Sequence, residues 1–141
     1  MKLVTLLFAL APVAFGQAGT KMLVGSWTAQ FEGTTFIRLE LNAADGGITG
    51  GMSLGNIELD PQGAVRRAHP VPPGLKPIAN ATQRGSILAF VLDEGDEPDR
   101  FEFRLLEGGR AELHFLLNED DREELAANGI AAFRPIVLTR Q

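Results

Sequence analysis

The sequence predicts an all-β protein: an antiparallel barrel or near-closed sandwich of roughly eight strands, with one short helix before the last strand. Two observations carry this prediction. Apolar and polar residues alternate with a period of two over most of the chain, which places one row of side chains in a core and the other in water. Turns rich in glycine, or begun by proline, separate the alternating runs at the spacing of β-hairpins.

The first 18 residues have the pattern of a secretory signal peptide. Lys2 supplies a positive charge, an apolar run follows, and the small residues Ala14, Gly16 and Ala18 offer cleavage positions. The apolar run is shorter than the roughly 20 residues of a transmembrane helix, although an uncleaved anchor or a buried first strand is an alternative. We therefore expect residues 1–18 to be removed and residues 19–141 to form one domain, exported to the periplasm or exterior of a bacterium.

Composition narrows the choice of partners. The chain has no Cys and a formal net charge of −5. An exported domain without disulfides must be held together by packing and sheet hydrogen bonds. A negative surface repels phosphate backbones and anionic lipid headgroups, so we expect no nucleic-acid partner. No second apolar run is long enough for a membrane, so we expect no integral span after cleavage. Nothing in the sequence indicates a cofactor.

The mature chain reads as a series of short strands joined by turns. Residues 87–92 are apolar throughout, which fits a strand covered on both faces. The turns at 45–47 and 107–110 contain glycines that reach positive φ, and a proline begins the turn at 60–63. The alternating runs cover residues 27–32, 37–41, 48–54, 57–60, 100–105 and 111–117, and a final strand covers about 133–140.

Two segments break this alternation. Residues 69–77 contain four prolines, and because proline fixes φ and lacks an N–H, we expect an irregular or polyproline-like crossing there and not a strand. Residues 118–128 are expected to form the single helix. Asn118 would cap its start, acidic residues would favour its positive end, and Gly129 would follow its end.

Both ends of the mature chain resemble the lipocalins and the wider calycin group of β-barrels. Gly25-Ser26-Trp27 opens the first strand, and Arg140 lies in the last, with Arg134 as a second candidate. In that family the Trp closes one end of an up-and-down barrel and a basic side chain packs across it. The resemblance thus implies that Gly25, Trp27 and Arg140 form a plug at the barrel's end. The proline crossing and the missing disulfide depart from the family, and the chain is also similar to small exported bacterial β-domains of unknown role.

The leading functional hypothesis is non-enzymatic binding, in which the barrel holds a small apolar ligand or its rim contacts an envelope protein. It rests on the inward-facing Phe, Leu and Ile rows and on the absence of a catalytic motif. The alternative is a structural or interaction module with a solid core. Such a module would dock through residues 69–77, with His69, Pro70, Pro72 and Pro73 as contacts, because polyproline-like chain is already extended before binding.

A hydrolase ranks third. Glu58 and Asp60, spaced i and i+2 along one strand, could act as acid and base, assisted by His69. The carboxylate-rich loop at 93–99 could hold Ca²⁺, and His69 could share a metal with His114. However, neither an EF-hand nor a His-x-His spacing is present, so the sequence predicts a solvated loop and no metal site.

Overall fold

The computed structural model describes residues 20–92 and 98–141. Residues 20–23 form a helical turn before the first strand. The longer elements are β1 (Gly25–Phe31), β2 (Thr34–Ala44), β3 (Gly47–Leu54), β4 (Ile57–Leu59), β5 (Val65–Ala68), β6 (Lys76–Arg84), β7 (Ile87–Leu92), β8 (Asp99–Leu105), β9 (Arg110–Leu116), α2 (Glu119–Ala127) and β10 (Ile136–Arg140).

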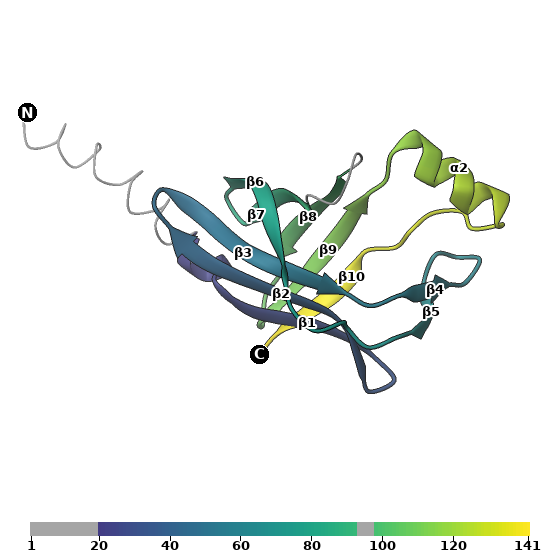
Figure 1. Ribbon diagram of the computed structural model, residues 1–141, viewed down its shortest axis with the longest axis horizontal. Coiled ribbons are helices and arrows are strands. Elements are labelled where there is room, and N and C mark those ends of the chain that lie inside the picture. The colour runs from purple at the N-terminus through teal and green to yellow at the C-terminus, as the bar shows by residue number, and fades with distance from the viewer. Residues whose placement is uncertain (1–19, 93–97) are drawn as a thin grey trace, which may run out of the picture.

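Eight of these strands close into one antiparallel barrel (Figure 1). Around the barrel they follow the order β1-β10-β9-β8-β7-β6-β3-β2, so each strand pairs with its neighbour in the chain apart from one detour. That detour is the separate ribbon of β4 and β5, inserted between β3 and β6. The predicted all-β barrel, with one short helix before the last strand, is therefore confirmed.

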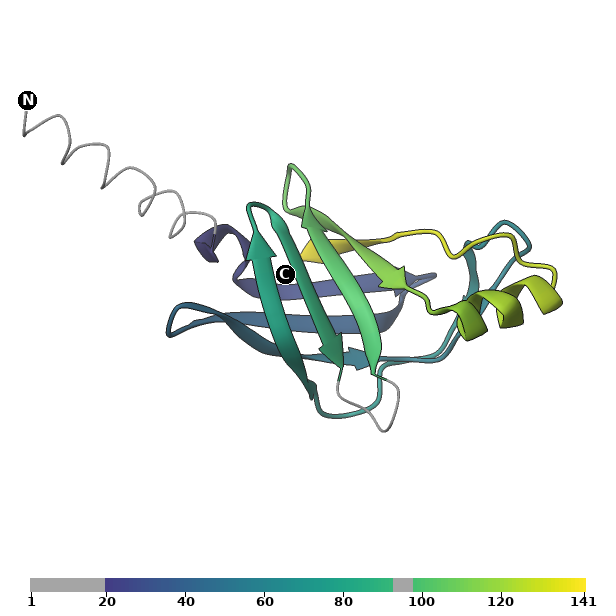
Figure 2. The ribbon, with the colours of Figure 1, turned by 90° about the horizontal axis from the view of Figure 1, so that it is seen from above.

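Both excursions from the barrel lie at the same end of it. The β4–β5 ribbon and α2 project together on the right of Figure 1, and the view from above agrees (Figure 2). The helical turn of residues 20–23 lies at the opposite end of the barrel, just before β1. The barrel thus has two different ends, which we call the closed end, at the start of β1, and the open end, beneath α2.

Alternation explains how the strands form the barrel wall. In β2, Leu39 and Leu41 are buried, whereas Arg38, which immediately precedes Leu39, is exposed. These two leucines face Met52 and Gly50 of β3 in an antiparallel register. Successive strand residues point to opposite faces, so the apolar row enters the barrel and the charged row faces water.

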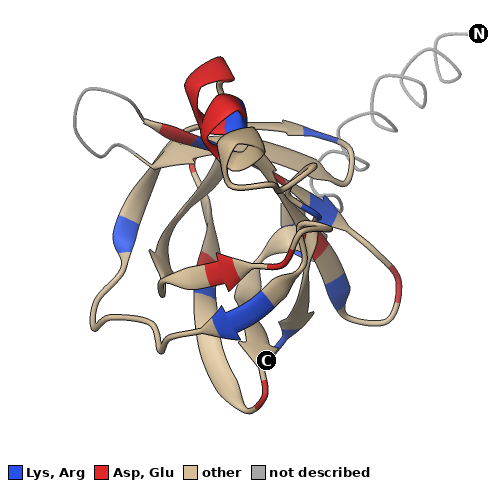
Figure 3. Ribbon diagram, turned by 90° about the vertical axis from the view of Figure 1, so that its right-hand side faces the viewer, with Lys and Arg blue, Asp and Glu red and all other residues tan. Residues whose placement is uncertain are grey.

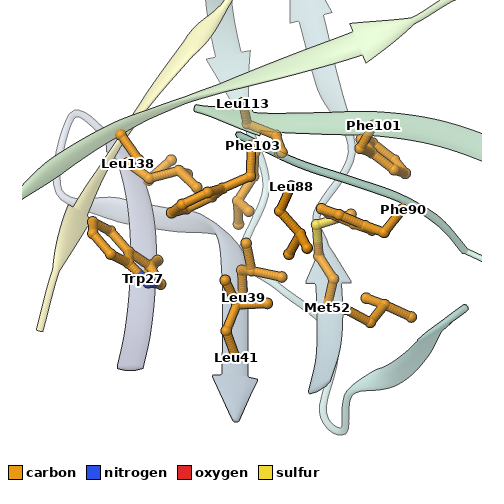
Figure 4. Close-up of a cluster of buried hydrophobic side chains, with 14 of the residues drawn as sticks. Trp27, Leu39, Leu41, Met52, Leu88, Phe90, Phe101, Phe103, Leu113 and Leu138 are labelled. Carbon is orange, nitrogen blue, oxygen red and sulfur yellow. The ribbon is translucent and has the colours of Figure 1, made fainter. Parts of the chain in front are cut away.

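Large apolar side chains fill the middle of the barrel (Figure 4). They come from seven of the barrel strands, and each exposes at most 2% of its surface. Burial of one such side chain contributes about 1.5–3 kcal/mol. The lumen is therefore a packed core, as small barrels commonly have. The residues labelled in Figure 4 are Trp27, Leu39, Leu41, Met52, Leu88, Phe90, Phe101, Phe103, Leu113 and Leu138.

Two strand boundaries differ from the sequence prediction. The irregular crossing ends at residue 75, because β6 begins at Lys76 and Pro77 pairs with Gly51 of β3. A proline is tolerated there because it is the second residue of the strand, where the lost N–H removes little of the ladder. The last strand begins at Ile136 and not at residue 133, because the segment before it bonds to a turn outside the barrel.

Within the described ranges, 20–92 and 98–141, no helix combines the length and the apolar character needed to cross a membrane.

Candidate functional site

The closed end is organised around Trp27. The indole ring is completely buried, its N–H donates to the Leu23 carbonyl at 3.0 Å, and its edge meets the ring of Phe103, with 5.0 Å between the centroids. The Arg140 guanidinium lies over the indole face, 4.3 Å from the ring centroid. An arginine over an indole adds a favourable cation–π contact to the apolar packing.

Arg140 also ties the chain's two ends together. Its guanidinium donates to the backbone carbonyls of Met22 and Val24, which belong to the segment entering β1. Gly25 leaves room for this arrangement, because a Cβ at that position would lie 2.7 Å from Nη1 of Arg140. The structure thus brings Gly25, Trp27 and Arg140 into direct contact. Arg134, the second candidate, lies elsewhere and donates from Nε to the Gln62 carbonyl at 3.1 Å.

The open end contains a cavity of about 850 Å³. It lies between the ends of β8 and β9, strand β4, helix α2 and the segment that follows the helix. This volume falls within the range of small-molecule sites, about 300–1,000 Å³. Its apolar lining includes Ile57, Leu59, Phe101, Phe115, Leu125 and Phe133.

A line of aromatic rings in contact leads from the packed core to this cavity. Phe90 and Phe101 stack with centroids 5.5 Å apart, and Phe101 meets the edge of Phe115 at 5.0 Å. Phe115 then stacks on Phe133 at 4.4 Å. Phe90 and Phe101 are buried, whereas Phe115 and Phe133 are half-buried. The core therefore continues outward into a partly exposed aromatic wall.

Helix α2 covers the cavity without packing tightly on the barrel. Asn118 caps the helix by accepting a hydrogen bond from the Asp121 N–H at 2.7 Å, as the sequence predicts, and Asn128 ends it. No residue of the helix is buried. Leu125 is its one large apolar side chain, and it is half-buried in the lining of the cavity. A helix with so little buried surface depends on its cap and on its connections for its position.

The segment after α2 is fastened to the turn between β4 and β5. Backbone N–H groups of Ala131 and Arg134 donate to the carbonyls of Pro61 and Gly63, at 3.2 and 3.1 Å. Gly63 has a φ of +85°, and a Cβ there would overlap the carbonyl oxygen of Ala132. We call these contacts between residues 60–63 and 131–134 the clasp. It joins the two excursions into one cap over the open end.

The rim of the cavity carries an excess of negative charge. Asp99, Asp121 and Glu124 line it together with one basic residue, Arg100. In the described parts of the chain, none of the three carboxylates has an ion-pair partner. In Figure 3, which views this end of the barrel, much of the ribbon of α2 is red because of its acidic residues. The helix contributes five carboxylates and one arginine: Glu119, Asp120, Asp121, Glu123, Glu124 and Arg122.

The proline crossing lies against the barrel wall with its proline side chains outward. The Val71 N–H donates to the Thr35 carbonyl at 3.1 Å, and the Ser53 hydroxyl donates to the Pro72 carbonyl at 3.0 Å. His69 is also anchored, since its N–H donates to the Asn56 carbonyl at 2.8 Å. The side chains of His69, Pro70, Pro72 and Pro73 are exposed.

The two carboxylates considered for acid–base chemistry are both engaged in structural contacts. Glu58 forms ion pairs with Arg66 and Arg67, at 3.5 and 3.1 Å. Asp60 lies beyond the end of β4, and its Oδ1 accepts from the N–H groups of Gln62 and Ala64, both at 2.9 Å. The carboxylate of Asp60 therefore holds the turn that carries the clasp.

The histidines lie in unrelated surroundings. His114 is half-buried on β9, with Nε2 3.2 Å from Oε1 of Glu112, and His69 lies on the crossing. Across residues 20–92 and 98–141, no group of three or more His, Asp or Glu side chains is placed to hold a metal ion. Most of the acidic loop, residues 93–97, lies outside the described residues, and Asp99 at its end begins β8.

Sequence reasoning did not identify the cavity, although two weak signals point to it. Leu125 is an isolated large apolar residue in an otherwise polar helix, and Phe133 and Ile130 are apolar residues in the segment just before β10. Such residues outside the alternating strands indicate packing that local periodicity does not account for. No family model matches this chain, and comparisons with curated proteins and with solved structures found no significant match.

Proposed function

We propose that this protein is an exported, non-enzymatic binding protein that holds a small apolar ligand in the cavity at the open end of a lipocalin-like barrel. The observation that carries the proposal is a half-open cavity of about 850 Å³ with an aromatic wall, bounded by a helix with no buried residue of its own. A ligand that covers the partly exposed aromatic wall would be stabilised by burial of apolar surface, at about 25 cal/mol per Å².

The proposal places the ligand beside the lumen and not within it. The side chains labelled in Figure 4 expose at most 2% of their surface, so the middle of the barrel has no room for a ligand. Of these side chains, only Phe101 also borders the cavity. The lipocalin-like part of the proposal rests on the contacts among Gly25, Trp27 and Arg140 at the closed end.

The proposal of export rests on the signal-like pattern of residues 1–18. N-terminal sequencing of the exported protein should find Gln17 or Gly19 as the first residue.

Titration of the purified protein with the neutral fluorophore N-phenyl-1-naphthylamine tests the proposal. Uptake should saturate at one molecule per chain. Leu125→Gln should weaken uptake about tenfold, because it removes an apolar wall of the cavity. Ala126→Gln is the matched control, since this exposed neighbour on the same helix does not line the cavity, and its uptake should be unchanged. Absence of saturable uptake, or equal effects of both substitutions, would refute the proposal.

The second candidate is a solid-core module that docks on an envelope protein through the proline crossing. It is favoured by the exposed side chains of Pro70, Pro72 and Pro73 on a segment held to the wall by backbone hydrogen bonds. A fixed, extended chain loses little entropy when a partner covers it. Replacing all three prolines with Ser should abolish cross-linking to that partner while leaving the melting temperature nearly unchanged. Undiminished cross-linking would exclude the segment.

A further inference from the structure

The aromatic wall of the cavity and the charged residues at its rim together select a ligand of a particular chemical class. The geometry points to a cationic amphiphile: a small molecule with an apolar body in the cavity and an ammonium or similar cation at the rim. This inference rests on the proposed binding function and adds the charge of the ligand to it.

Three carboxylates border the cavity, two from α2 and one from β8. Asp121 and Glu124 are three residues apart on α2 and therefore lie on the same side of the helix, the side that lines the cavity. Asp99 approaches from the start of β8. Because these carboxylates border one cavity, they all contribute to the electrostatic potential at its entrance.

These three carboxylates are not neutralised by basic side chains among the described residues. Within residues 20–92 and 98–141, Asp99, Asp121 and Glu124 form no ion pair, whereas Glu58 and Glu102 each pair with arginine. Arg100 is the one basic residue in the lining. The rim therefore has an uncompensated negative potential, which attracts cations and repels anions, more strongly beside a low-dielectric wall than in open water.

The apolar part of the lining distinguishes this site from a binding site for small cations. Phe101, Phe115, Leu125 and Phe133 offer no oxygen ligands to a metal ion, and no described group of three acidic or histidine side chains is arranged to hold one. A fatty acid or another anionic lipid would place its carboxylate against the acidic rim. Only a ligand that is apolar at one end and positive at the other satisfies both parts of the site.

Competition among three probes of equal chain length tests this inference. Dodecylamine, dodecanol and dodecanoate would each displace N-phenyl-1-naphthylamine from the protein, below their micellar concentrations. We expect dodecylamine to bind about tenfold more tightly than dodecanol, and dodecanoate more weakly than either. The advantage of the amine should shrink as salt is raised to ~0.5 M, because mobile ions screen the rim.

A matched pair of double variants locates the effect. Asp121→Asn with Glu124→Gln should remove most of the preference for the amine. Asp120→Asn with Glu123→Gln changes the charge of the same helix equally, at positions that do not line the cavity, and should leave most of the preference in place. The preference is measured within each variant as the ratio of the dodecylamine affinity to the dodecanol affinity, and saturable uptake of the neutral fluorophore reports that the variant is folded.

The outcomes distinguish this inference from the function on which it rests. If the neutral fluorophore is not taken up, the proposed binding function fails. If it is taken up but dodecylamine binds no better than dodecanol, or if both double variants lose the preference equally, binding stands and the inference of a cationic ligand is overturned.

Discussion

The two ends of the barrel use aromatic residues in opposite ways. At the closed end, Trp27 has no exposed surface and is enclosed by Phe103, Leu23 and the guanidinium of Arg140. At the open end, Phe115 and Phe133 stack on one another but remain half-buried beside a cavity. One set of rings completes the core, while the other extends it toward solvent.

We expect this difference to separate residues that stabilise the fold from residues that would bind the proposed ligand. Side chains that are fully buried and hydrogen-bonded at the closed end contribute to the free energy of unfolding. The open end keeps apolar surface available, and its covering helix has no buried residue, so it can change with little effect on the barrel. Substitutions at the closed end should therefore lower the melting temperature, and substitutions at the open end should act mainly on ligand uptake.

The largest effect should come from Trp27→Ala, which we expect to lower the free energy of unfolding by about 3–5 kcal/mol. Removing the indole leaves a cavity in the core and deprives Arg140 of its ring contact. Phe133→Ala is the comparison at the open end, where an aromatic ring is also lost but is half-buried, and should cost less than about 2 kcal/mol. Urea unfolding measures both. Equal losses would show that the two ends do not differ as described.

An intermediate effect is expected for Gly63→Ala in the clasp. The residue has a positive φ, and a Cβ would overlap the Ala132 carbonyl oxygen, so we expect a loss of about 2 kcal/mol or more, together with loss of fluorophore uptake. Gly74→Ala provides a control with nearly the same φ, +86°, and open space around the Cβ. It should cost only about 1 kcal/mol and preserve uptake. If Gly63→Ala keeps full uptake, the clasp does not position the cap.

The smallest effect on stability should come from Asn118→Ala. Loss of the N-cap removes the hydrogen bond to the Asp121 N–H and costs about 1 kcal/mol of helix stability. Because α2 has no buried residue, we expect faster amide exchange in the first turn of the helix and weaker ligand uptake, with little change in the melting temperature. Asn42→Ala, at an exposed site on β2, should change none of these. A large drop in melting temperature would mean that α2 supports the barrel.

Local features of the molecule were predictable from the sequence because neighbouring residues determine them. Alternation located most of the strands that form the wall, a continuous apolar run located β7, and no alternating run marked β6. Asn118 with the acidic residues after it located α2. The strand boundaries at Lys76 and Ile136 were not predictable, because pairing with β3 and the hydrogen bonds of the clasp decide them. Those partners lie far away in the chain.

The sequence by itself determined an antiparallel all-β chain with one capped helix, since period-two patterning, turn residues and caps act over a few residues. Only the tertiary structure decided that the barrel closes, that its lumen is packed, and that β4, α2 and the segment after α2 meet over one end to form a half-open cavity. The cavity lining is drawn from residues 57 to 133, and no local pattern encodes which distant segments will share a wall.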